Sequence, residues 1–178
     1  DKFAKLELKN QAGAVSFEGD FLCLDVSGGI VPSEVRMKIP DTAEIEASMR
    51  VIVDKGAAGI RFGGTPDDLS SGYFLGIGSG AYILQDLSGL KGAASDAKGD
   101  AANAAAAEKS VQKVAASVQP GQEYAVLFRI QGGSAMLCSC NGEVLAKFAV
   151  PDLKPGSVAV HVPAGSKLRM SDLKAKKP

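Results

Sequence analysis

Apolar and polar residues alternate along most of the chain. Between Ile45 and Val53 every second residue is apolar, and Glu46, Ser48 and Arg50 lie between them. A period of two is typical of an antiparallel strand that buries one face. The same pattern predicts short strands over residues 14–18, 21–26, 44–53, 58–62, 73–77, 81–85, 124–130, 135–140, 143–148, 157–162 and 167–173. So many short strands favour a sandwich or a barrel.

Turn residues separate these predicted strands. Asn141-Gly142 is the strongest hairpin signal, because both central positions of a type I′ turn need positive φ and these residues tolerate it best. Asp54-Lys55-Gly56 and Gly78-Ser79-Gly80 supply turn chemistry between other strand pairs. We therefore expect an all-β, antiparallel fold.

One alanine-rich segment breaks the alternation. Residues 92–118 are predicted to be an insertion, with a loop over 92–99 and a helix over 101–118 that Asp100 caps and Pro120-Gly121 ends. A narrow apolar stripe would either dock on the sandwich or pack on a partner; it consists of Ala107, Val111, Val114 and Val118. We expect one domain over residues 1–178 that carries this insertion.

Composition narrows the possible partners. Lys plus Arg and Asp plus Glu each number 20, and this balance argues against a nucleic-acid partner. The sequence has no apolar run long enough for a membrane span and no signal-peptide pattern. Because it begins at Asp1, we expect a mature or trimmed product. Three cysteines are too few for a disulfide scaffold, so we expect free buried thiols at Cys23, Cys138 and Cys140. A disulfide between Cys23 and one of the other two would require the fold to bring their strands together.

Candidate chemistry is sparse. His161 is the one histidine, and alternation turns it away from Val160 and Val162, toward solvent or a groove, where an incidental role is expected. Cys138-x-Cys140 has no second pair at zinc-site spacing. In the loop over residues 63–68, Asp67 and Asp68 are either a solvated acidic turn or, with backbone carbonyls, a calcium site. No other cofactor is expected.

The order of these strands resembles the concanavalin A-like lectin/glucanase superfamily, especially its laminin-G-like and 3-keto-disaccharide hydrolase-like members. The resemblance is carried by residues 44–53 followed by Ala58-Gly59-Ile60-Arg61-Phe62, by Gly72-Tyr73-Phe74-Leu75-Gly76-Ile77, and by the C-terminal series Gly121–Tyr124, Asn141-Gly142-Glu143 and Pro155–Val158. It implies a two-sheet antiparallel jelly-roll sandwich in an exported, periplasmic or cell-surface protein. The alanine-rich insertion departs from the family's compact pattern.

The catalytic motif of the glucanase branch is incomplete. That branch uses Glu-x-Asp-x-x-Glu, whereas Glu18-Gly19-Asp20-Phe21-Leu22-Cys23 ends in cysteine. The sequence therefore predicts a non-catalytic module that binds carbohydrate or a protein surface. The predicted ligand-binding residues are Arg61, Asp67, Asp68, Tyr73, Tyr82 and Gln85.

Two other functions stay open. One is a glycoside hydrolase or lyase of the 3-keto-disaccharide type that uses Glu46, Asp67 and Asp68. The other is an assembly domain that oligomerises through residues 92–118.

Overall fold

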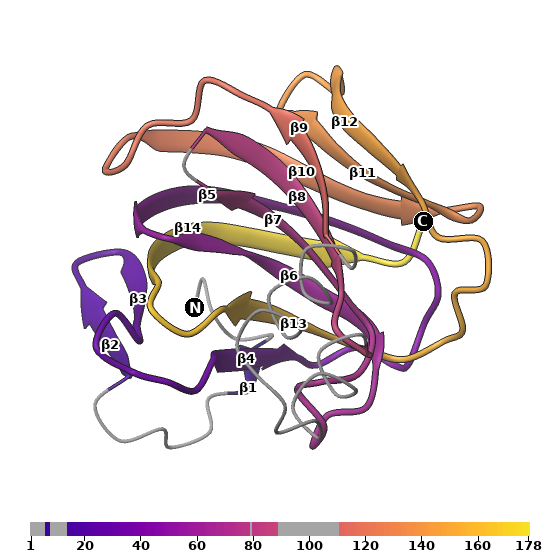
Figure 1. The fold of residues 1–178 in the computed structure, drawn as a ribbon, viewed down its shortest axis with the longest axis horizontal. Helices are drawn as coiled ribbons and strands as arrows, with labels where there is room; N and C mark the ends of the chain where they lie inside the picture. The colour runs from indigo at the N-terminus through magenta and orange to yellow at the C-terminus, as the bar shows by residue number, and fades with distance from the viewer. Residues whose placement is uncertain (1–5, 8–13, 79, 89–110) are drawn as a thin grey trace, which may run out of the picture.

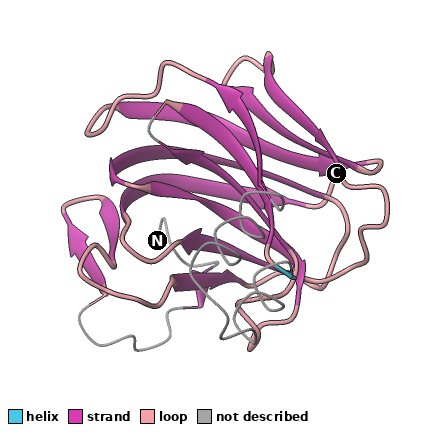
Figure 2. Ribbon diagram, viewed as in Figure 1, coloured by secondary structure: helices cyan, strands magenta, loops and turns pink. Residues whose placement is uncertain are grey.

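The computed structural model describes residues 6–7, 14–78, 80–88 and 111–178, and these form two seven-stranded antiparallel sheets (Figures 1 and 2). Sheet A contains, in spatial order, β1 (Leu6–Glu7), β4 (Ser33–Met37), β13 (Ser157–Val162), β6 (Ala57–Gly64), β7 (Tyr73–Gly78), β8 (Ala81–Asp86) and β9 (Val111–Ala115). Sheet B contains β12 (Val144–Ala149), β11 (Ser134–Ser139), β10 (Glu123–Gln131), β5 (Ile45–Lys55), β14 (Lys167–Lys176), β3 (Phe21–Asp25) and β2 (Val15–Glu18).

Strands that are distant in the sequence are neighbours in both sheets. β13 lies between β4 and β6, and β14 lies between β3 and β5. The chain changes sheets between β5 and β6, so the predicted turn at Asp54-Lys55-Gly56 connects the two sheets instead of forming a hairpin. Gly56 has φ 70°, and a Cβ there would lie 2.2 Å from Ser166 Oγ, so this turn requires glycine.

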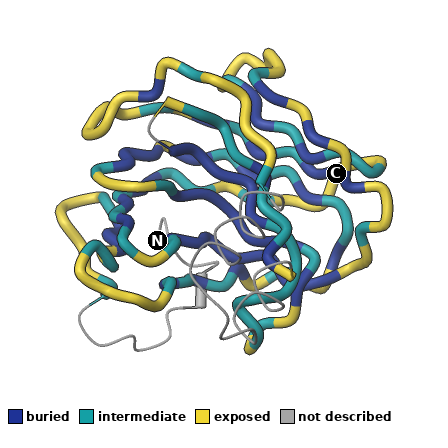
Figure 3. The backbone as a smooth tube through the Cα atoms, viewed as in Figure 1, coloured by how far each residue is buried: buried dark blue, intermediate teal, exposed yellow. Residues whose placement is uncertain are grey.

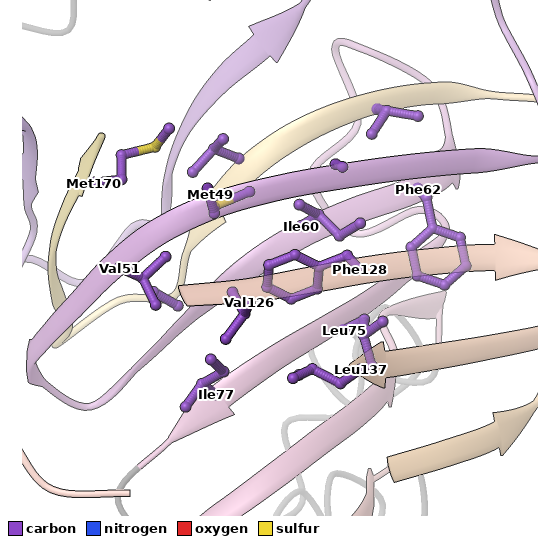
Figure 4. Close-up of a cluster of buried hydrophobic side chains, with 14 of the residues drawn as sticks. Met49, Val51, Ile60, Phe62, Leu75, Ile77, Val126, Phe128, Leu137 and Met170 are labelled. Carbon is purple, nitrogen blue, oxygen red and sulfur yellow. The ribbon is translucent and has the colours of Figure 1, made fainter. Parts of the chain in front are cut away.

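The two sheets enclose one apolar core. Alternation places Val51 of β5 and Phe128 of β10 on the inner face of sheet B, and Ile60 and Leu75 on the inner face of sheet A (Figure 4). The buried segments run through the middle of both sheets, whereas the loops and edges are exposed (Figure 3). Each such buried side chain stabilises the fold by about 1.5–3 kcal/mol. Alternating residues of β5 and β10 are buried, as the period of two predicted for strands that bury one face.

The helix predicted over residues 101–118 is wrong where the structure describes it. Residues 111–115 form β9, in which Gln112 pairs with Leu84 and Val114 with Tyr82 of β8. Spacings of three and four fit a helical stripe, but β-branched valines also suit a strand, and pairing satisfies the backbone groups at the edge of β8. Val118 does join the core. Residues 116–118 are described and are not helical, whereas residues 101–110 of the predicted helix and the loop over residues 92–99 lie outside the described residues.

The hairpin at Asn141-Gly142 forms with a different turn. β11 and β12 pair as predicted, but in the part of the chain that the structure describes the only positive φ outside glycine belongs to Asp172, so Asn141 lacks the geometry of a type I′ turn. Gly142 N–H donates to the carbonyl of Ser139 (3.0 Å), and Ser139 N–H donates to the carbonyl of Glu143 (2.8 Å). These bonds and the φ of 84° at Gly142 fit a three-residue loop with a left-handed glycine.

Candidate functional site

The predicted ligand-binding residues of sheet A lie on opposite faces of that sheet. Cross-strand pairing places Arg61, Phe74 and Gln85 in one row on the outer face, the face turned away from sheet B. Tyr73 and Tyr82 point inward and pack against the core. Burial raises the pKa of both tyrosines, and Asp86 and Asp152 raise that of Tyr73 further. The six residues predicted to form a site are therefore not gathered in one place.

Arg61 is buried and holds a loop together. Its side chain is 1% exposed, and its Nε and Nη2 each donate to the Glu34 carboxylate at 2.6 Å. The guanidinium also donates to backbone carbonyls of the β6–β7 loop, at Thr65 (3.0 Å), Ser71 (3.1 Å) and Asp68 (3.3 Å). A charge-assisted fork of this kind fixes geometry in two directions. Arg61 therefore acts here as the structural cation of the loop.

In the loop where the sequence predicted a calcium site, several oxygen atoms already accept hydrogen bonds from the protein. Calcium takes six to eight oxygen ligands, but three carbonyl oxygens of this loop already accept hydrogen bonds from Arg61. Oδ1 of Asp68 accepts from Ser70 N–H (3.1 Å) and Ser70 Oγ (2.6 Å), forming an Asx turn. Within the described ranges, no group of three or more His, Cys, Asp or Glu side chains is arranged to hold a metal ion.

His161 is buried, whereas the sequence predicted it toward solvent or a groove. Its side chain is 3% exposed, its Nδ1 lies 2.9 Å from Glu34 Oε2, and its ring lies 5.2 Å from that of Phe74. Alternation correctly directs it away from the core, but every residue of β13 is buried, including those on the outer face. A period of two identifies the face of a residue and not whether that face is covered.

Glu34 is the centre of this outer cluster on sheet A, and sequence reasoning missed it. Burial raises the pKa of its carboxyl, but the hydrogen bonds and charges of Arg61 and His161 outweigh burial and leave the pKa below its ordinary value. The strand that carries Glu34 was not predicted. Its sequence does alternate, because the apolar residues Val35 and Met37 are interleaved with Glu34 and Arg36, and this pattern could have identified it. The cluster is buried and internally paired, which fits a structural role.

The outer face of sheet B is open and contains a hollow with a volume of about 400 Å³. Register explains it: Lys174 of β14, Ser48 of β5 and Leu127 of β10 form one row across the sheet. The side chain of Ser48 is short, so the middle of this row forms a depression in the outer face of the sheet. We call the hollow the sheet B trough; its lining includes Glu46, Ser48, Arg50, Leu127, Asp172 and Lys174.

Ion pairs form both rims of the trough. On one side, Arg129 Nε lies 3.2 Å and Lys176 Nζ 3.3 Å from the carboxylate of Glu46. Burial raises the pKa of Glu46, but these two cations outweigh it and lower the pKa. On the other side, Arg50 contacts Glu123 at 2.5 Å and Asp172 at 3.5 Å, which raises the pKa of the guanidinium. Each rim thus carries donors and acceptors in fixed positions.

A β-bulge in β14 shapes one of these rims. The register between β14 and β5 shifts between Ser171 and Lys174, and Asp172 within the bulge has φ 54°. Aspartate tolerates this left-handed conformation better than most residues, and bulges commonly redirect side chains near binding sites. The bulge turns Asp172 toward Arg50. Beside the bulge, the buried hydroxyl of Ser171 has no hydrogen-bond partner among the residues that the structure describes.

A smaller hollow of about 180 Å³ lies at one end of sheet A. Tyr73 lines it together with Asp86, Asp152 and Lys154. The Tyr73 ring stacks on Phe62, with centroids 5.8 Å apart and an interplanar angle of 21°, so that one ring face is covered. Tyr73 is one of the six predicted ligand-binding residues, and the structure places it in the lining of this hollow.

The three cysteines are free, but they differ in exposure. Cys23 and Cys138 are buried as predicted, whereas Cys140 is exposed, contrary to the prediction, and lines the sheet B trough. Burial raises the pKa of the Cys23 and Cys138 thiols. The alternation signal placed Cys140 inside a strand, but β11 ends at Ser139.

The residues of the alternative enzymatic hypothesis come from different sheets. Glu46 lies in β5 of sheet B and lines the trough, while Asp67 and Asp68 lie in the β6–β7 loop of sheet A. Neither aspartate lines a described hollow that Glu46 also lines.

No helix in the described ranges has the length and apolar character that crossing a membrane requires.

Comparison with solved structures shows that the two sheets form a jelly-roll sandwich, the fold that the sequence predicted. The carbohydrate binding module CBM66 from Bacillus subtilis matches with a TM-score of 0.65 at 7% identity, over 93% of this chain and 92% of that one. A putative glycosyl hydrolase from Parabacteroides distasonis matches with a TM-score of 0.61 at 12% identity, over 99% and 90%. The PL7 alginate lyase AlyA1 from Zobellia galactanivorans matches with a TM-score of 0.51 at 12% identity, over 95% and 87%.

These likenesses concern the fold alone, which is shared by a binding module and by enzymes. No family model and no curated protein matches the chain.

Proposed function

We propose that the protein is a non-catalytic carbohydrate-binding module and that the sheet B trough holds the sugar. The observation that carries this proposal is an open hollow of about 400 Å³ whose rims carry fixed charged donors and acceptors. Ligand sites combine an apolar surface with a few placed polar groups. The likeness of the fold to CBM66, a carbohydrate binding module, supports the same assignment.

The chemistry of the trough suits sugar hydroxyls. Glu46 and Asp172 accept hydrogen bonds, and Arg50 and Lys174 donate them. Ala125 and Leu127 offer apolar contact for the C–H groups of a sugar ring. Because ion pairs already hold Glu46 and Arg50 in place, a ligand would lose less side-chain entropy on binding there.

The test is to fill the trough. Ser48→Trp places an indole in the depression between the rims, and we expect it to abolish saccharide binding measured by glycan array and by calorimetric titration. Ser16→Trp is the matched control, because Ser16 is an exposed serine on β2 of the same sheet and does not line the trough. Thermal unfolding of both variants verifies that they fold.

Two results would overturn the proposal. One is the absence of binding to any saccharide by the unmodified protein, and the other is undiminished binding by Ser48→Trp. Binding to a protein ligand that Ser48→Trp abolishes, in the absence of saccharide binding, would instead favour the protein-surface alternative.

The Tyr73 hollow is a second candidate sugar site, favoured by the combination of an aromatic ring with Asp86, Asp152 and Lys154. Sugar binding that survives Ser48→Trp and is lost in Tyr73→Ala would assign the site there. We also propose an exported or cell-surface location, the setting in which a module for external polysaccharides would act.

A further inference from the structure

We infer that the saccharide bound in the sheet B trough is anionic, with its carboxylate or sulfate group held by Lys174. This inference rests on the proposed carbohydrate-binding function and specifies its ligand class. The observation behind it is that Lys174 lines the trough and has no carboxylate partner among the described residues.

The charges around the trough do not cancel. Its rims and floor carry four cations and three carboxylates; these are Arg50, Arg129, Lys174 and Lys176, and Glu46, Glu123 and Asp172. Arg50 pairs with Glu123 and Asp172, while Arg129 and Lys176 both pair with Glu46. Among the residues that the structure describes, no Asp or Glu oxygen lies within ion-pairing distance of Lys174.

The position of Lys174 makes this charge available to a ligand. Lys174 is exposed and stands directly across from Ser48, in the same row between the two rims. Ser48 offers a hydroxyl without a charge, so the centre of the trough is positive while its carboxylates lie at the rims in ion pairs. An anionic group over Ser48 would therefore meet an ammonium and a hydroxyl donor, and the paired carboxylates would repel it less than free ones.

The test compares acidic oligosaccharides with their neutral counterparts. The probes are uronate tetramers (galacturonate, glucuronate and mannuronate) with their carboxyl-reduced forms, and sulfated tetrasaccharides with their desulfated forms. We expect calorimetric titration to show about tenfold tighter binding of the acidic member in the carboxylate arm, the sulfate arm or both, which identifies the anion. This preference should shrink when ionic strength rises from 0.05 to 0.5 M, because salt screens exposed charges.

Lys174→Met should weaken binding of the acidic form more than binding of the neutral form, so that the preference for the acidic form disappears. Lys147→Met is the matched control, because Lys147 is an exposed lysine on β12, on the same outer face but outside the trough lining. Equal or tighter binding of the neutral form, or a preference that survives Lys174→Met, would overturn the inference while the binding function stands. If neither these probes nor any other saccharide binds, both the inference of an anionic ligand and the proposed carbohydrate-binding function are overturned.

Discussion

Two arginines of this protein make the same bidentate contact with a carboxylate, one on the outer face of each sheet. Arg61 holds Glu34 at 2.6 Å through two nitrogens, and Arg169 holds Asp54 at 2.7 Å through two nitrogens. They differ in burial: the side chains of the first pair are 1% and 8% exposed, and those of the second are 29% and 22% exposed. Equal geometry in different solvent settings gives these charges different roles.

On sheet A the charged groups are enclosed and are used to hold the structure, because a buried charge must be paired and hydrogen-bonded. On sheet B the charged groups reach solvent, where they contribute little to stability but can exchange water for a ligand. The position of a charge relative to solvent thus separates a structural cluster from a candidate binding face.

The largest effect should come from breaking the buried pair. Arg61→Met leaves Glu34 buried without its main partner and frees the carbonyls of the β6–β7 loop, so we expect the free energy of unfolding to fall by about 3–5 kcal/mol. Urea unfolding followed by circular dichroism measures it.

Arg169→Met is the geometric control and should cost no more than about 1 kcal/mol. Adding Glu34→Gln to Arg61→Met should restore part of the loss, because it removes the unpaired charge. Equal losses in Arg61→Met and Arg169→Met would show that burial does not separate the two pairs.

The pH dependence of stability should sharpen the same contrast. The pKa of Glu34 is lower in the folded protein than its ordinary value of 4.5. The unfolded chain therefore binds this proton more readily, and the stabilisation is complete above pH 4.5 and is lost as the pH falls through the folded pKa. Urea unfolding of the unmodified protein from pH 7 to pH 3 should show this decline.

Glu34→Gln provides the reference for that decline. It should be less stable than the unmodified protein at pH 7, and the gap between them should narrow below pH 4.5, because the carboxyl becomes neutral like the amide. A gap that stays constant over this range would show that Glu34 ionisation does not stabilise the fold.

The sequence predicted the sandwich well because alternation is a local signal. Each strand face, such as that of Ile45, Met49 and Val53, can be inferred from adjacent residues alone. The helix over residues 101–118 was wrong at β9 because pairing with the edge of β8, which is not a local feature, favours a strand there over the local alanine content.

The sheet B trough was not predictable in the same way. It depends on the register between β14, β5 and β10, and Arg50 and Asp172, which form part of its rim, are 122 residues apart in the sequence. The sequence showed Tyr73 and Arg61 as neighbours of charged residues, but it could not show that one packs inward and the other is enclosed. Alternation alone places Glu46 between the inward residues of its strand, whereas its pairing with Lys176 and Arg129 depends on the fold.

Labelling of the thiols should have the smallest effect on stability, and it also compares an exposed group with buried ones. Cys140 lines the trough and is exposed, whereas Cys138, two residues earlier, is fully buried with a raised pKa. A thiol-reactive reagent should therefore modify Cys140 quickly and Cys138 and Cys23 slowly, because reaction requires an accessible thiolate. Mass spectrometry of labelled peptides distinguishes the three sites, and Cys140→Ser should remove the fast phase.

A bound uronate tetramer should slow labelling of Cys140 and leave the slow thiols unchanged. Unchanged labelling at saturating tetramer would place the sugar elsewhere, and would leave the open face of sheet B without its proposed ligand.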